Sequence, residues 1–174
     1  SLLITRAHYK GYIGEQIIIY SQEMFWFAKT VYLRINKAVG DESPTHLALL
    51  GVVVIVGIGL RGFAMSLPAQ YDESVIATDL LQMPFVVAMT KYTWPGNHLF
   101  QTALSHLSWQ WFGESTVAMR LPVFIFGVAS LPLSYLFIRI VASREAALVA
   151  TALIATNHYL VAYSGDARGY AIVC

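Results

Sequence analysis

The sequence predicts an all-α polytopic membrane protein, and three observations lead to this fold class. Of the 174 residues, 57% are hydrophobic and 12% are charged, whereas about a quarter of the residues in a soluble domain are charged. Three apolar runs are each close to the ~20 residues that a helix needs to cross a bilayer. Segments with the amphipathic period of a helix lie before and between these runs.

The N-terminal segment, residues 1–45, is predicted to lie on the cytoplasmic side. Within it, residues from about 15 to 39 place polar side chains on one side of a helix and aromatic and aliphatic side chains on the other. Four charges inside this stretch argue against a membrane span, at Glu23, Lys29, Arg34 and Lys37. Two interpretations remain: an amphipathic helix in the membrane interface, or a helix packed against a partner protein.

Residues 46–174 are predicted to form the membrane region. Spans are expected at 46–68, 117–138 and 146–163, and Tyr170 is expected to begin a fourth. The first span contains GIGLRG (Gly57–Gly62), which has the letters of a nucleotide-binding loop. A dinucleotide site needs a preceding strand in a βαβ unit, so we expect these glycines to permit close packing of helices instead.

An outer loop, residues 69–116, connects the first two spans and is predicted to contain juxtamembrane helices. Leu99–Phe112 is too short to cross a bilayer but is amphipathic. Its apolar residues share one face, and Gln101, Thr102, Ser105 and Ser108 lie roughly opposite. Because it also carries Trp109 and Trp111, we expect it to lie at the membrane interface.

Lysine and arginine near the span ends predict the orientation. Five of them precede the first span and two lie in the turn at 139–145, whereas the outer loop holds only Lys91. The N-terminus and that turn are therefore predicted to be cytoplasmic. The outer loop and the SGDARG segment then face the same outer side, and we expect an integral protein of a prokaryotic cytoplasmic membrane.

Several groups that could carry chemistry gather on this outer side. Asp72 and Glu73 directly follow the first span, His98 begins the amphipathic helix, and Asp166 and Arg168 follow the third span. Acids, a histidine and a cation at one interface could deprotonate a hydroxyl and hold a phosphate. The alternative for each acid is a hydrated loop carboxylate without a catalytic role.

Two arginines lie near the outer ends of the spans. Arg61 and Arg120 could either snorkel towards the interface or contact an anionic lipid headgroup. The net charge of +1 gives no basis for nucleic acid binding. The single Cys174 excludes an internal disulfide bond and a cysteine-based metal site in this sequence.

The order of these features resembles a known family. The acidic pair in YDES is followed by PGNHLFQTALSHLSWQWFGES, then by RLPVFIFGVASLPLSYLF, SREAALVATAL and YSGDARGY. From residue 47 onwards, this order resembles the N-terminal part of the GT-C class of membrane glycosyltransferases, which use polyprenyl-phosphate sugar donors. The protein O-mannosyltransferases and lipid A aminoarabinose transferases are the most similar branches.

The resemblance implies sugar transfer from a polyprenyl-phosphate-linked donor to an acceptor hydroxyl on the outer side, with inversion at the anomeric carbon. It implies that Asp72 is the base or the group that orients the acceptor, that Glu73 completes the pair, and that Asp166 is an acid near the active site. The members of the family continue for several further spans, so we expect this sequence to be the N-terminal part of such an enzyme.

The resemblance also implies a binding set. Arg61, Arg120, Arg168 and Tyr170 would contact the substrate or its phosphate, although the ARGY segment could equally have a structural role. His98 matches a position that holds a divalent metal in some relatives, or it could cap its helix. The alternative function is a non-catalytic structural subunit of a larger membrane complex, with other membrane subunits as partners. Charge is scarce inside the spans, which makes a transporter less favoured.

Overall fold

A computed structural model of the protein describes residues 20–37, 40–90 and 98–167. In these residues the regular structure is entirely helical, so the predicted all-α fold class is confirmed for this part of the chain. The chain divides into two compact units, residues 1–42 and 43–174. Arg168 and Tyr170, two of the predicted binding residues, lie outside the described residues.

In the first unit, residues 20–37 form a helix within the predicted amphipathic segment. Its large side chains are largely exposed, including Phe25, Trp26 and Tyr32. The Lys29 ammonium lies 5.0 Å from the centroid of the Trp26 ring, which is a cation–π distance. The aromatic side chains of this helix therefore have little cover from the rest of its unit.

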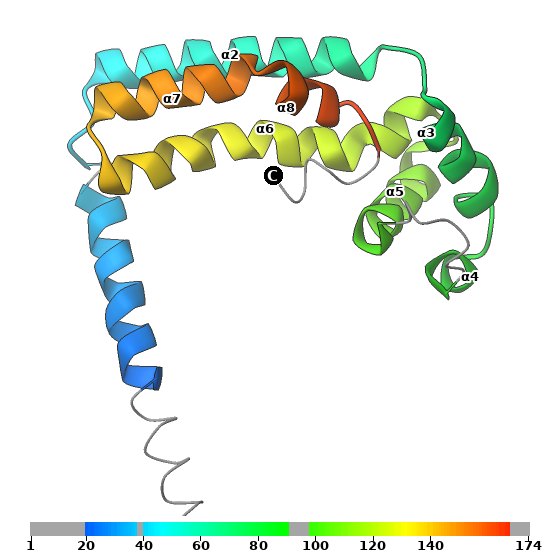
Figure 1. Ribbon diagram of the computed structural model, residues 1–174, viewed down its shortest axis with the longest axis horizontal. Helices are drawn as coiled ribbons and strands as arrows, with labels where there is room; N and C mark the ends of the chain where they lie inside the picture. Colours follow the sequence, from blue (N-terminus) through cyan, green and yellow to red (C-terminus); the bar gives the residue numbers. More distant parts are fainter. Residues whose placement is uncertain (1–19, 38–39, 91–97, 168–174) are drawn as a thin grey trace, which may run out of the picture. The chain divides into compact units, whose positions relative to one another are not determined.

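The second unit is built on three long segments that lie along one another (Figure 1). They are α2 (Pro44–Met65), α6 (Thr116–Val141) and the pair α7 (Arg144–Thr156) and α8 (His158–Tyr163). The helix α2 begins two residues before the predicted span because Ser43 caps it, accepting a hydrogen bond from the His46 N–H at 3.3 Å. Among the described helices, α2 and α6 are long and apolar enough to cross a membrane.

The third predicted span is not one helix. Asn157 adopts extended backbone angles between α7 and α8, and its side-chain oxygen accepts hydrogen bonds from the N–H groups of Tyr159 and Leu160 at 3.0 and 3.1 Å. Asparagine is a strong helix N-cap, so the apolar run from 146 to 163 is interrupted at this residue. The prediction of a continuous helix was wrong here because apolar periodicity outweighed this local signal.

Short helices gather where α2 ends and α6 begins (Figure 1). They are α3 (Tyr71–Val75), a π-helical turn η1 (Ile76–Leu80), α4 (Phe85–Thr90) and α5 (Leu99–Phe112). A small apolar core, formed by Ile76, Leu80, Leu81, Met119 and Ala167, joins η1 to α6 and to the segment after α8. Residues 69–90 and 98–116 therefore contain short helices, as predicted for this loop, while their position beside a membrane stays a prediction.

The glycines of GIGLRG differ in their packing. A Cβ at Gly57 would meet Leu131 and Ala155, whereas a Cβ at Gly59 or Gly62 would meet nothing within 4 Å. Close packing of helices thus explains Gly57 alone. Gly165 lies against backbone, since a Cβ there would lie 2.8 Å from the backbone carbon of Ala64 in α2.

Candidate functional site

A buried ion pair between Glu73 and Arg120 lies at the centre of the candidate site. The Arg120 side chain donates from Nε to Glu73 Oε1 at 2.9 Å and from Nη2 to Glu73 Oε2 at 2.5 Å. The two side chains are 0% and 2% exposed. This two-bond geometry is the strongest form of an arginine–carboxylate contact, and it joins α3 to the start of α6.

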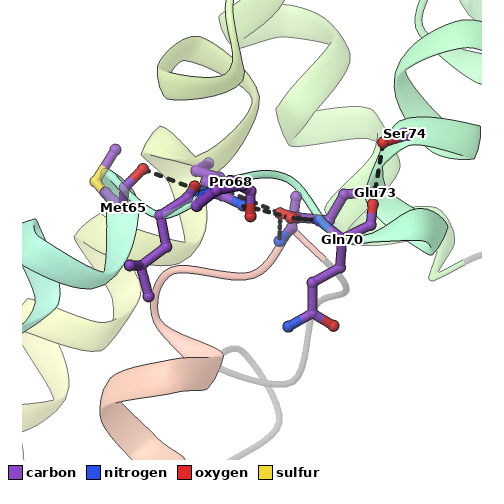
Figure 2. A network of polar contacts seen from close by, with 8 residues as sticks. Met65, Pro68, Gln70, Glu73 and Ser74 are labelled. Carbon is purple, nitrogen blue, oxygen red and sulfur yellow. Dashed lines mark hydrogen bonds and ion pairs between the residues drawn. The ribbon is translucent and has the colours of Figure 1, made fainter.

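The same guanidinium closes the C-terminal end of α2. Its Nη1 donates to the carbonyls of Met65 and Leu67 at 2.9 and 2.7 Å, and its Nη2 donates to that of Pro68 at 3.3 Å (Figure 2). The last carbonyls of a helix lack partners within the helix, and a cation at this end also opposes the helix dipole. Arg120 therefore fixes the path of the chain from α2 into α3.

Glu73 in turn holds two backbone N–H groups. Its Oε2 accepts from Gln70 at 3.1 Å, which ties the carboxylate to the start of its own helix. Its Oε1 accepts from Ala167 at 2.8 Å, which ties α3 to the segment that follows α8. Each carboxylate oxygen therefore accepts two hydrogen bonds, and residues separated by more than 90 positions in the sequence meet at one side chain.

These contacts decide the ionisation of Glu73. Burial by itself would raise the pKa of the Glu73 carboxyl, but the hydrogen bonds from Arg120, Ala167 and Gln70 outweigh it and lower the pKa below its ordinary value. The carboxylate therefore stays ionised at neutral pH. Because its acceptor positions are occupied and it is buried, this geometry favours a structural role for Glu73 over that of a base.

Asp72 and Asp166 are each one residue from this hydrogen-bonded centre. Asp72 is exposed in the first turn of α3, beside buried Glu73. Asp166 is 8% exposed and precedes Ala167, whose N–H binds Glu73. The two acids predicted from the outer loops are thus brought to one end of the helical unit. After α3 the helix widens into the π-turn η1.

The helix α5 is turned opposite to the usual arrangement in water. Its polar face is buried, including Gln101, Ser105 and His106, whereas Phe100 and Trp111 are 60% and 76% exposed. The Ser105 hydroxyl donates to the carbonyl of Met119 in α6 at 2.7 Å. The predicted amphipathicity of this helix is present, but its polar side chains bind protein and do not face solvent.

One contact of this face replaces a backbone hydrogen bond that α6 lacks. Pro122 has no N–H, so it cannot bind the carbonyl of Ala118 one turn earlier. The Ser108 hydroxyl donates to that carbonyl at 2.5 Å. On the same face, the ring of His106 contacts the carbonyl of Met83 through Nε2 at 2.9 Å, as expected for a structural histidine.

Arg61 is also buried, at 1% exposed, so neither Arg61 nor Arg120 snorkels to an interface. Its Nη1 donates to the carbonyls of Gly57 and Ala155 at 3.3 and 3.1 Å, and its Nη2 donates to that of Ile154 at 3.5 Å. The last two carbonyls belong to the final turn of α7. Arg61 therefore caps α7 beside the break at Asn157, as Arg120 caps α2.

The predicted metal ligand, His98, occupies the N-cap position of α5, although its side chain makes no capping hydrogen bond. In residues 20–37, 40–90 and 98–167, no three histidine, cysteine, aspartate or glutamate side chains lie close enough to hold a metal ion together. A divalent metal at His98 therefore stays a prediction without support from this geometry.

Sequence reasoning identified Glu73 and Arg120 individually but assigned them to separate tasks, catalysis and phosphate binding. Their ion pair was missed because no local pattern links positions 47 residues apart. One signal was available in the sequence: Glu73 follows the first apolar run and Arg120 lies at the start of the second. Opposite charges at the same end of two packed helices can pair when both are buried. In comparisons with known proteins, no family, no curated protein and no solved structure matches this chain.

Proposed function

We propose that this chain is the N-terminal part of a membrane glycosyltransferase that takes sugar from a polyprenyl-phosphate donor. One observation carries the proposal: the hydrogen bond from Ala167 to Glu73 joins the segments that contain Asp166 and Asp72. Asp72, which is exposed, and Asp166, which is 8% exposed, are then brought to the same end of the helical unit from segments far apart in the sequence. A site of this kind can remove a proton from an acceptor hydroxyl while a lipid phosphate leaves the sugar.

A location in the membrane is supported by where the apolar surface lies. Only 17% and 28% of the residues in the most apolar parts of α2 and α6 are buried, whereas the core helices of a soluble protein are mostly buried. Phe137 in α6 and Leu153 in α7 are 73% and 67% exposed. The apolar face of α5 is exposed as well. Lipid covers such a surface without the cost it would have in water.

Within the acidic pair, the geometry assigns different roles to the two residues. Glu73 is buried and bound on both oxygens, so we assign it to positioning. Asp72 is exposed at the first turn of α3, and we assign it as the base or the group that orients the acceptor. Asp166, which is 8% exposed, is the second acid of the site. Arg120 is bound to Glu73 and three carbonyls, so its phosphate-binding role is not part of this proposal.

The proposal is tested with membranes from cells that express the protein. They are incubated with a panel of radiolabelled polyprenyl-phosphate sugars, and both the sugar transferred to acceptors in the membranes and the polyprenyl phosphate released are quantified. We expect turnover of at least one donor that falls at least 100-fold in Asp72→Asn, because general acid–base catalysis contributes about 10²–10⁴-fold. Ser74→Ala, two residues away and also exposed, is the matched control. Full activity in Asp72→Asn would refute the assignment.

A second candidate function is favoured by the helix at residues 20–37. Its exposed aromatic side chains, among them Phe25 and Trp26, fit a structural subunit that docks on another membrane protein. In that case, other subunits would copurify in fixed ratio with the wild type and equally with Asp72→Asn. Alanine at Phe25 and Trp26 would abolish the copurification.

A further inference from the structure

The two buried arginines of the second unit differ in how completely they are satisfied. A guanidinium has five N–H donors and no acceptor. The five contacts of Arg120 lie between 2.5 and 3.3 Å and include a carboxylate. Arg61 makes three contacts between 3.1 and 3.5 Å, all to backbone carbonyls. Its Nε is buried and has no hydrogen-bond partner among the described residues.

Arg61 also has no counter-charge among the residues that the structure describes. Of the ion pairs in the described part of the chain, one joins Arg120 to Glu73 and two involve Glu145, and none includes Arg61. The end of α7 supplies only about half a negative charge through its helix dipole. A buried guanidinium without a carboxylate costs several kcal/mol, so a buried charge within an apolar helix marks a functional site with a partner to be identified.

A small cavity of about 100 Å³ adjoins this side chain. Arg61, Gly127 and four hydroxyl residues line it, together with Ile154 and Leu160; the hydroxyl residues are Ser130, Ser134, Tyr163 and Ser164. Gly127 keeps it open towards the cation, because a Cβ there would lie 3.4 Å from Arg61 Nε and would collide with Ser164.

The hydroxyls of this cavity are not equivalent. Ser130 and Ser164 donate their protons to the carbonyls of Gly127 and Leu160, at 2.8 and 2.6 Å. Ser134 makes no hydrogen bond to any residue that the structure describes, so its hydroxyl can donate to a ligand. The cavity thus offers a cation with an unused N–H and one unused hydroxyl donor, which is the chemistry that recognises an oxyanion.

We propose that the cavity between α2, α6 and the α7–α8 break binds a phosphate-type oxyanion through Arg61 and Ser134. A lipid headgroup and a free phosphate ion share this chemistry. The site shares Arg61 with the binding set expected from the family resemblance, but it involves neither Asp72 nor Asp166, so its binding is tested independently of sugar transfer. A bound oxyanion would also supply the negative charge that Arg61 lacks inside an apolar helix.

The test uses the full purified chain in detergent micelles and measures thermal stability against ligand concentration. The two probes are short-chain phosphatidic acid and inorganic phosphate, with phosphatidylcholine of the same chain length as a neutral-headgroup control. A ligand that binds only the folded state raises the midpoint in a saturable manner. Native mass spectrometry of the same samples gives the stoichiometry, which we expect to be one.

The deciding variant is Ser134→Leu, which fills the cavity and leaves Arg61 in place on α7. We expect at least tenfold weaker binding with an unchanged midpoint in the absence of ligand. Leu133→Phe adds bulk at the neighbouring position, which is 62% exposed and does not line the cavity, and should bind as the wild type does. Arg61→Gln should also lose binding, but it removes the cap of α7, so the conclusion rests on Ser134→Leu.

Saturation by phosphatidic acid alone would identify a lipid headgroup as the occupant, and saturation by both probes would identify the phosphate group itself. Either result supports the site if Ser134→Leu abolishes it. The proposal is overturned if neither probe binds the wild type, in which case the cavity holds only water. It is also overturned if Ser134→Leu and Leu133→Phe bind with equal affinity.

Discussion

Replacement of Glu73 by glutamine tests the buried ion pair with almost no change of shape. Each carboxylate oxygen accepts two hydrogen bonds, one from Arg120 and one from a backbone N–H. A glutamine keeps one oxygen and presents an NH2 group to the other two donors. Two buried donors are then unsatisfied, at about 1–3 kcal/mol each, and Arg120 loses its counter-charge. Breaking a buried pair costs about 3–5 kcal/mol.

We therefore expect Glu73→Gln to lower the free energy of unfolding by about 3–5 kcal/mol. Reversible denaturation in mixed detergent micelles, followed by circular dichroism, measures this change. Asp72→Asn is the matched control, since an exposed neighbour should change stability by about 0.5 kcal/mol or less. A loss below about 1 kcal/mol in Glu73→Gln would refute the reasoning, because that is the range of an exposed ion pair.

Three further predictions concern stability. The pKa of Glu73 is lower in the folded protein, so the stability that its carboxylate adds is complete above about pH 4.3, the ordinary glutamate pKa, and is lost as the pH falls through the folded-state pKa. The difference in melting midpoint between the wild type and Glu73→Gln should therefore narrow below about pH 4.3 and stay constant above it. Ser108→Ala should lower the free energy of unfolding by about 1–3 kcal/mol in the wild type, because the Ala118 carbonyl left free by Pro122 loses its donor. In a Pro122→Ala background, where the helical N–H is restored, the loss should be about 0.5 kcal/mol or less, and equal losses in both backgrounds would contradict this. Gly165→Ala should cost about 1–3 kcal/mol through its collision with the backbone of α2, whereas Gly59→Ala, which has open space, should be neutral or stabilising by up to about 1 kcal/mol; thermal melts of the two variants check the contrast.

Local patterns in the sequence predicted the helices well. The helix α5 has the predicted bounds, Leu99–Phe112, and is followed by Gly113 with a φ of +91°. The helix α6 begins one residue before the predicted span, after Ser115, whose side chain caps it. Composition and helical period are properties of neighbouring residues, so they can be read without the fold. The break at Asn157 was the exception, because a single capping residue competed with a long apolar run.

The direction of α5 could not be predicted from its amphipathicity alone. The period shows that Gln101 and Phe100 lie on different faces, but which face the protein covers depends on whether water or lipid lies outside. The structure buries the polar face, where serines such as Ser105 bind carbonyls of α6. Whether water or lipid lies outside therefore decides which face of α5 is buried, and amphipathicity alone does not reveal it.

The sequence predicted which acids lie near the candidate site, but not the contacts that hold them there. Asp72 and Asp166 were predicted to face the same side because the spans alternate in direction. The identity of their connection could not be predicted, since it depends on the pairing of Glu73 with Arg120 across 47 residues and on the N–H of Ala167. Long-range pairing is a property of the packed helices, to which local periodicity gives no access.

The proposed function requires that α2 and α6 cross a membrane and that Asp72 lies on its outer side. Single cysteines at Tyr71, Glu114 and Glu145, each in a Cys174→Ser background, test it with a membrane-impermeant maleimide in intact cells. We predict labelling at Tyr71 and Glu114 in intact cells, and labelling at Glu145 only after permeabilisation. Equal accessibility of all three cysteines in intact cells, or protection of all three, would contradict the account.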